Sequence, residues 1–173
     1  MLRTSSLPAH RQDLGAQDVL DGDAVTFLES PASLVLGMTL PDGAPYACHV
    51  WGLRVTSPAD GTVQLVLGTR DAQELPEPAG APVAITAAAV ETLQGLQAKG
   101  HVVSTESSTD EDLALFEHHR DAFFAEIERV DGEPIELLAR MVPPEMTTWV
   151  IRLEQLFDQT PGPGAGAAIG AGT

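Results

Sequence analysis

The order of the apolar segments is the feature that most constrains how this chain can fold. Stretches with strand-like composition occupy residues 33–40, 46–55, 62–67, 83–87 and 93–103, and turn signals of proline, glycine and aspartate separate them. One long helical pattern follows, and a further strand-like stretch covers residues 147–153. Because strands come first and do not alternate with helices, the sequence predicts an α+β fold built on an antiparallel sheet.

The long helical pattern lies between Thr109, which with Asp112 forms a capping arrangement, and Gly132. Its apolar residues recur at helical spacing: Leu113, Phe116, Phe123 and Ile127. We expect Phe116, Phe123 and Ile127 to bury one face of the helix against the sheet. Shorter helices are expected near residues 23–28, with Asp23 as the N-cap, and 136–141.

A length of 173 residues suits one domain. We expect an N-terminal arm over residues 1–22, the folded domain over 23–159, and a flexible tail of glycine, alanine and proline over 160–173. Glycines at positions 95 and 100 predict a bulge or a close approach of another backbone.

Charge and cysteine content exclude several classes of function. The formal net charge is −16, which argues against nucleic acid or an anionic membrane as the main partner. Cys48 is the only cysteine, so an intrachain disulfide is impossible and a reducing, cytoplasmic location is favoured. No apolar stretch has the length of a membrane span or the form of a signal peptide.

The histidines offer little evidence for a metal or a catalytic site. His118 and His119 are adjacent in the predicted helix, so their side chains point about 100° apart, and a solvated pair is expected. Cys48 and His49 face opposite sides of a strand and do not form a dyad. His101 can face either a pocket or water. The glycine-rich tail lacks the following helix that phosphate loops require.

Several segments, taken in order, resemble the pyridoxamine 5′-phosphate oxidase-like split-barrel flavoproteins. Residues 34–46 are similar to the family's opening hairpin, residues 49–51 and 61–70 to its second and third strands, and residues 96–100 to a later polar strand. The resemblance covers residues 24–158. It implies a six-stranded antiparallel split β-barrel of Greek-key type with one long helix and one or two short ones, a homodimer, and FMN in a groove between the subunits.

The resemblance also implies where the cofactor is held. The family carries basic residues on the second strand and a Ser-Arg-Lys-like segment that grips the FMN phosphate, whereas this chain has Cys48 and Leu53, then residues 71–73 of sequence Asp-Ala-Gln. The candidate cofactor-binding residues that remain are Arg54, Thr69, Arg70, Gln97 and Lys99. We expect Arg70 and Lys99 to hold the phosphate with Thr69, and Gln97 to face an edge of the cofactor.

Two classes of function follow. The first is an FMN-binding oxidoreductase whose small-molecule substrate is unassigned, with a deazaflavin-dependent reductase as a variant on the same fold. The second is a split-barrel dimer without flavin that acts as a ligand-binding module. Asp71 lies in the segment that corresponds to the family's phosphate-binding residues, and its negative charge would repel a phosphate. This favours the second class.

Overall fold

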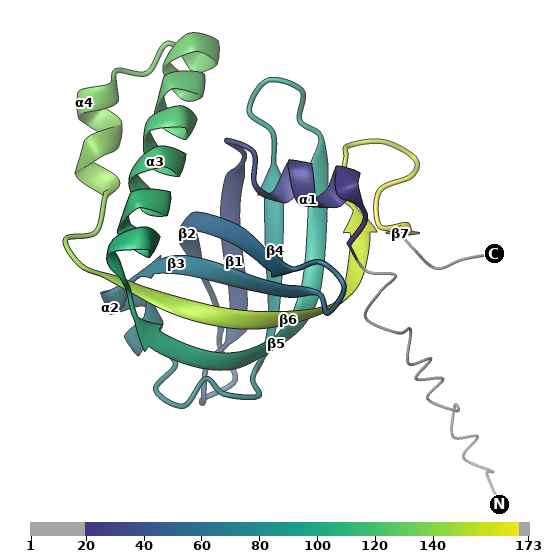
Figure 1. The fold of residues 1–173 in the computed structure, drawn as a ribbon. Helices are drawn as coiled ribbons and strands as arrows, with labels where there is room; N and C mark the ends of the chain where they lie inside the picture. The colour runs from purple at the N-terminus through teal and green to yellow at the C-terminus, as the bar shows by residue number, and fades with distance from the viewer. Residues whose placement is uncertain (1–19, 170–173) are drawn as a thin grey trace, which may run out of the picture.

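The computed structural model describes residues 20–169 and shows a closed six-stranded antiparallel barrel (Figure 1). Its strands are β1 (Ser33–Thr39), β2 (Pro45–Ser57), β3 (Thr62–Gly68), β4 (Pro82–Ala88), β5 (Gly95–Ser107) and β6 (Met146–Asp158). They follow the order β3-β2-β1-β4-β5-β6, and pairing of β3 with β6 closes the barrel. Because β4 returns to lie beside β1, the topology is a Greek key, and the predicted fold class is confirmed.

Strand alternation fills the barrel with apolar side chains. Leu34 and Leu36 of β1, Ile85 of β4 and Ile151 of β6 are fully buried. Helix α1 (Gly22–Leu28) adds Ala24 and Leu28 to this core. Asp21, and not the predicted Asp23, is its N-cap, because the Asp21 carboxylate accepts a hydrogen bond from the Ala24 amide at 2.8 Å.

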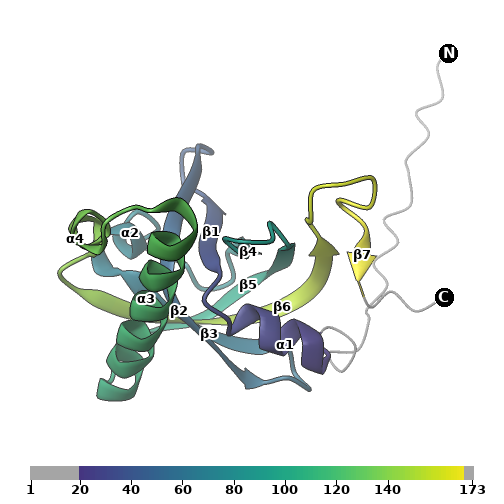
Figure 2. The same cartoon turned by 90° about the horizontal axis from the view of Figure 1, so that it is seen from above.

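Helix α3 (Asp110–Asp131) crosses the outer face of β2 and β3, and α4 (Ile135–Leu138) with η2 (Ala139–Met141) returns beside it (Figure 2). The predicted capping box of Thr109 and Asp112 is present, and Gly132 ends the helix with a φ of 73°. Gly52 lets α3 approach closely, because a Cβ at that position would lie 3.2 Å from Leu115 Cγ.

The predicted buried face of α3 is partly correct. Phe116 and Phe123 are buried in a second apolar cluster with Trp51 of β2, and Ile127 is half-buried against it. Leu113 is 40% exposed, and Phe124 is buried as well as Phe123. One apolar cluster contains the phenylalanines of α3, residues of the barrel and Leu138 of α4. The buried stripe of α3 is wide because the helix packs against both of these neighbours.

Gly95 and Gly100 occupy close approaches between β5 and β6, as the sequence predicts. A Cβ on Gly100 would lie 1.9 Å from the Arg152 carbonyl oxygen, and one on Gly95 would lie 2.9 Å from the Gln159 backbone. The register between the two strands shifts between Lys99 and Gly100, which is the signature of a bulge.

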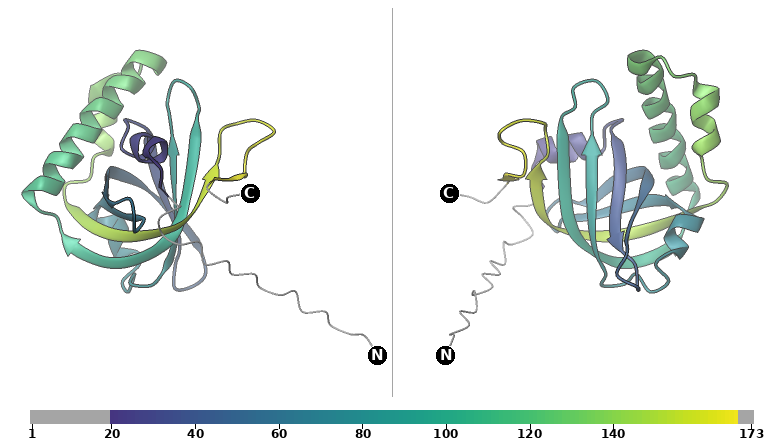
Figure 3. Two further views of the ribbon diagram at one scale, coloured as in Figure 1. Left: turned by 45° about the vertical axis from the view of Figure 1, so that its right-hand side comes forward. Right: turned by 180° about the vertical axis from the view of Figure 1, so that it is seen from behind.

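Two short elements were not predicted from the sequence. Helix α2 (Thr69–Gln73) links β3 to the loop before β4, and strand β7 (Ala168–Ile169) pairs with the end of β6 (Figure 3). The tail from residue 160 was expected to be mostly irregular, and within residues 160–169 the structure adds the two-residue strand β7 to it. Most of the expected N-terminal arm, residues 1–19, lies outside the described residues. Between residues 20 and 169, no helix combines the length and apolar character that a membrane span requires.

Candidate functional site

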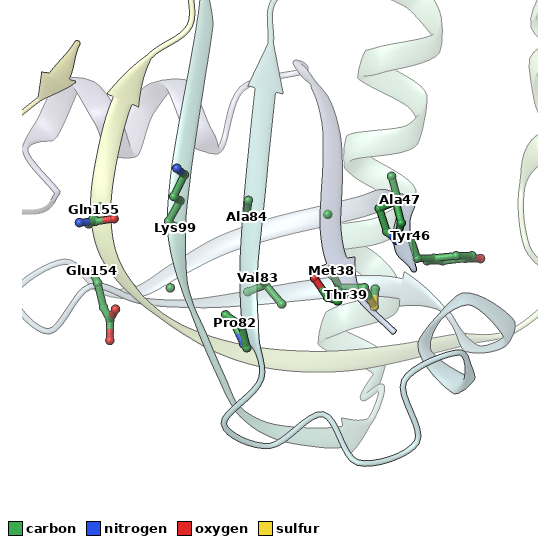
Figure 4. A pocket seen from close by; sticks show the side chains of 13 residues that line it. Met38, Thr39, Tyr46, Ala47, Pro82, Val83, Ala84, Lys99, Glu154 and Gln155 are labelled. Atoms are coloured by element: carbon green, nitrogen blue, oxygen red, sulfur yellow. The ribbon is translucent and has the colours of Figure 1, made fainter. Parts of the chain in front are cut away.

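An open groove of about 690 Å³ runs over the outer face of β1, β4 and β5 (Figure 4). Strand register places Ala47 of β2, Gly37 of β1 and Ala84 of β4 side by side along its floor. The same row continues into Lys99 of β5 and Gln155 of β6. Since three adjacent positions carry at most a methyl group, the groove floor is shallow and smooth enough for a flat ligand.

The groove has polar groups at one end. Gln97 and Lys99 share the outer face of β5, as their spacing of two residues predicts, and Glu154 and Gln155 of β6 lie next to Lys99. The Lys99 ammonium lies 4.6 Å from the ring centroid of Phe157, and Gln97 Nε2 donates to Thr86 Oγ1 at 3.2 Å. A nearly apolar floor that ends in convergent polar side chains is typical of small-molecule sites.

His101 borders this polar end. It pairs in register with Pro82, which lines the groove, and its Nδ1 lies 2.9 Å from Oε1 of Glu154, which also lines it. The sequence left open whether His101 faces a pocket or water, and the structure places it beside the groove.

Helix α2 meets the opposite end of the groove, beside β2. Tyr46, which lines the groove, donates from its hydroxyl to Asp71 Oδ1 at 2.8 Å. This hydrogen bond, together with burial, raises the pKa of Tyr46 to about 12. Arg70 is exposed and has no ion-pair partner among residues 20–169. Thr69 lines a separate cavity of about 390 Å³ beside Trp149.

The structure does not bring Arg70 and Lys99 together within one chain. Asp71 hydrogen-bonds to β2, so Arg70 lies near that strand, whereas Lys99 lies on β5. The path from β2 through β1 and β4 to β5 is three strand spacings, or about 14 Å. Within one chain the two cations therefore lie on different sides of the groove, and the expectation that both hold one phosphate stays a prediction.

Arg54 faces helix α3 and does not line the groove. Its guanidinium pairs with Glu111, lies 3.5 Å from Asp112 and donates to Gln64 at 2.5 Å. Its charge is therefore already neutralised by the first turn of α3. The role of Arg54 in cofactor binding stays a prediction, and it would require the guanidinium to leave these partners.

The expectation that His118 and His119 form a solvated pair is wrong for His119. His118 is exposed, but His119 lies on the Phe116–Phe123 stripe and is only 6% exposed. The rings of His119 and His49 both stack on Phe123, with centroids 6.1 and 5.4 Å away. The helical spacing of His119 from both phenylalanines was the signal that could have revealed its burial.

These two imidazoles are held neutral. The Nε2 atom of each is buried and has no hydrogen-bond partner among residues 20–169. Burial lowers the pKa of both histidines to about 4, and the nearby His49 adds to this effect at His119. No group of three or more histidine, cysteine, aspartate or glutamate side chains within residues 20–169 could hold a metal ion.

Cys48 faces the barrel core while its neighbour His49 faces outward toward Phe123, so the two side chains lie on opposite faces of β2 as their adjacent positions predict. Burial, with a contribution from Asp71, raises the pKa of the thiol to about 12. The thiol is therefore a buried core side chain that stays protonated at neutral pH.

No family model matches the sequence, and no curated protein matches it. Among solved structures, HupZ of Group A Streptococcus is similar at 16% identity and a TM-score of 0.52, covering 86% of this chain and 99% of HupZ. A candidate pyridoxamine 5′-phosphate oxidase from Lactobacillus delbrueckii is similar at 17% identity and a TM-score of 0.50, covering 81% and 94%. Barrel topology and these likenesses define the chain as a split-barrel protein. The resemblance to the pyridoxamine 5′-phosphate oxidase-like proteins is thus confirmed for the fold.

Proposed function

We propose that this protein is a flavin-binding oxidoreductase that holds FMN, or a deazaflavin, in the groove on the outer face of β1, β4 and β5. The observation that supports it best is the flat floor of Ala47, Gly37 and Ala84 that ends at Lys99. A planar tricyclic ring can lie on such a floor without displacing a side chain. The bound flavin would supply the redox chemistry, and the chain would supply orientation and electrostatics.

The groove residues fit the ring portion of the ligand. Lys99, which lines the groove, can donate a hydrogen bond to its polar edge, and Gln97, outside the lining but two residues away on the same face of β5, could donate a second. The Lys99 cation would also favour the negative charge that a reduced ring carries. The apolar floor and Pro82 would exclude water from the ring face.

The phosphate portion would lie at the α2 end, where Arg70 has no ion-pair partner among residues 20–169. The Thr69 hydroxyl would serve as a neutral donor only if the phosphate reached the separate cavity that Thr69 lines. Asp71 opposes this role, because its carboxylate adds a negative charge beside the phosphate. Its hydrogen bond from Tyr46 directs one oxygen of the carboxylate toward β2. We therefore expect FMN to bind more weakly than it would if Asp71 were neutral.

The proposal is tested by adding wild type, Arg70→Ala or Asp71→Ser to FMN and following the quenching of the FMN fluorescence. A charge-assisted contact to phosphate is worth roughly 1.5 to 3 kcal/mol, so Arg70→Ala should weaken binding by about one to two orders of magnitude. Asp71→Ser should tighten it. Riboflavin, which lacks the phosphate, is the matched ligand control and should bind all three proteins alike. Equal FMN affinities in all three would contradict the assignment of the phosphate end.

A second candidate function is a split-barrel ligand-binding module without flavin. Asp71 in the phosphate-binding segment and the engagement of Arg54 by α3 favour it. If none of the three proteins quenched the fluorescence of FMN, riboflavin or a deazaflavin, this function would be supported over the oxidoreductase.

The proposal includes a homodimer in which the groove faces the partner subunit. Val35 and Val103 on the outer barrel face are 37% and 48% exposed, and a partner would cover such residues. A location in the cytoplasm also belongs to the proposal, since the single buried cysteine suits a reducing compartment.

A further inference from the structure

The cavity of about 390 Å³ beside Trp149 lies at one end of the barrel, where β3 ends and β6 begins. Its size is within the range of small-molecule sites, and barrel mouths are common places for them. Trp149 pairs in register with Thr105 of β5 and with Leu65 of the barrel core. Because paired positions share one face of a sheet, Trp149 and Thr105 both face the barrel interior.

Helix α2 separates this cavity from the groove. Asp71 of α2 accepts the hydrogen bond from Tyr46, which lines the groove, whereas Thr69 and Gln73 of the same helix line the cavity. A ligand in the cavity would therefore occupy a site of its own.

The indole N–H of Trp149 is the feature that points to a ligand. Trp149 is only 1% exposed, and its Nε1 donates no hydrogen bond to any residue from 20 to 169. Within the same range, the side-chain nitrogens that are completely enclosed and have no partner are Nε2 of His49 and of His119. Nε1 of Trp149 is not one of them, so it stays accessible from the cavity that Trp149 lines. A buried indole N–H usually has an acceptor, and here the acceptor must come from a molecule in the cavity.

Further hydrogen-bonding groups line the cavity. The hydroxyls of Thr69 and Thr105 and the amide of Gln73 make no side-chain hydrogen bond within the described part of the chain. Thr147 Oγ1 donates to the Glu106 carbonyl at 2.9 Å, which leaves its lone pairs as acceptors. The lining thus offers both donors and acceptors.

The charges favour a neutral ligand. Among residues 20–169, no charged side chain lines the cavity, and Leu75 and two prolines of the same loop supply an apolar wall. Asp71, Glu74 and Glu77 lie between lining residues along the chain, with Arg70 as the one cation in that stretch. This excess of negative charge disfavours an anion, and an ammonium would find no carboxylate in the lining.

We propose that this cavity binds a small neutral molecule whose carbonyl oxygen accepts the hydrogen bond from Trp149 Nε1. Thr105 and Gln73 would accept from the ligand's own donor. An amide or a lactam has this chemistry, because it joins a strong acceptor to an N–H donor and an apolar body.

Nitrogen-15 NMR of the protein without flavin tests this with δ-valerolactam, a neutral cyclic amide, as the probe. The chain has two tryptophans and hence two indole N–H signals, and Trp149→Phe identifies its own. Should that variant not fold, Trp51→Phe gives the same assignment. We expect the Trp149 signal to shift and saturate, with a Kd in the millimolar range that suits a probe of this size, while the Trp51 signal stays in place.

Two controls test the ligand class and the site. Pyroglutamate, a lactam that carries a carboxylate, should bind at least about ten times more weakly than δ-valerolactam. Thr105→Val removes a hydroxyl with little change of shape and should weaken binding of δ-valerolactam about 3- to 10-fold, the usual effect of one lost hydrogen bond. Thr26→Val, in α1 and outside the lining, should leave the affinity unchanged.

Four results would overturn the proposal. They are the absence of a saturating shift at Trp149, an equal shift of both indole signals, binding of pyroglutamate as tight as that of δ-valerolactam, and an unchanged affinity in Thr105→Val. None of these results involves a flavin, so the proposed function stands or falls separately.

Discussion

At the scale of single residues, the two buried imidazoles make stability depend on pH. The pKa of His49 and of His119 is about 4 in the folded chain because burial disfavours the charged form, whereas an unfolded histidine has a pKa near 6.5. The unfolded state therefore binds more protons between these values. Stability is complete above about pH 6.5 and falls as the pH decreases toward 4.

We expect each of the two histidines to cost about 2 kcal/mol of unfolding free energy between pH 7 and pH 5. Urea unfolding at both pH values measures this loss. His119→Leu should remove about half of the pH dependence, and His118→Leu, at the exposed neighbour, should leave it unchanged. Equal pH dependence in all three proteins would show that His119 is not buried in solution.

Phe123 is the central side chain of the α3 cluster, because it contacts both imidazoles and Phe124. Phe123→Ala should destabilise the protein by about 3 to 5 kcal/mol through lost burial and a cavity. Leu113→Ala on the exposed side of α3 is the control and should cost less than about 0.5 kcal/mol. Equilibrium unfolding monitored by tryptophan fluorescence measures both, and a loss below about 1 kcal/mol for Phe123→Ala would contradict the packing.

At the scale of elements, the close approach of β5 to β6 depends on the missing side chain of Gly100. Gly100→Ala should place a Cβ inside the Arg152 carbonyl, so the strands must separate locally and the ladder must break. We expect a loss of several kcal/mol or failure to fold. Gly22→Ala is the control, because a Cβ added at this position, at the start of α1, would meet no atom of another segment within 4 Å. It should leave the thermal midpoint nearly unchanged. Similar midpoints for the two variants would contradict the register of β5 and β6.

The C-terminal strand contributes a small part of the sheet. Only Leu156 and Phe157 of β6 pair with β7, and Ile169 is 38% exposed. Deletion of residues 165–173 should therefore lower the thermal midpoint by no more than a few degrees. Circular dichroism melting of the shortened chain tests this, and a collapse of the midpoint would show that the tail packs on the barrel more extensively.

At the scale of the whole molecule, the outer barrel face is the surface on which the proposed groove and the proposed dimer coincide. A homodimer should have twice the chain mass of 18.2 kDa in light scattering. Val35→Glu should shift the mass toward the monomer, because it places a charge on the exposed side of β1. Leu93→Glu, in an exposed turn, is the control and should not. A monomer mass at all practical concentrations would remove the dimer.

The order of the strands along the chain, the limits of α3 and the close approaches at the glycines of β5 could all be predicted from the amino-acid sequence. These features depend on local physics: alternation of apolar residues, a capping box at Thr109 and the absence of a Cβ at Gly95 and Gly100. The spacing of Gln97 and Lys99 likewise placed both on one face without reference to the fold.

The neighbours of those residues in space depend on strand pairing and could not be predicted from the sequence. Strand register sets Gly37 between Ala47 and Ala84, and no segment of the sequence carries that adjacency, because the three residues come from separate strands. Closure of the barrel put Arg54 against α3, separated Arg70 from Lys99, and joined His101 to Glu154 across 53 residues of chain. Long-range pairing determines such contacts, so the candidate site became visible only once the strands were paired.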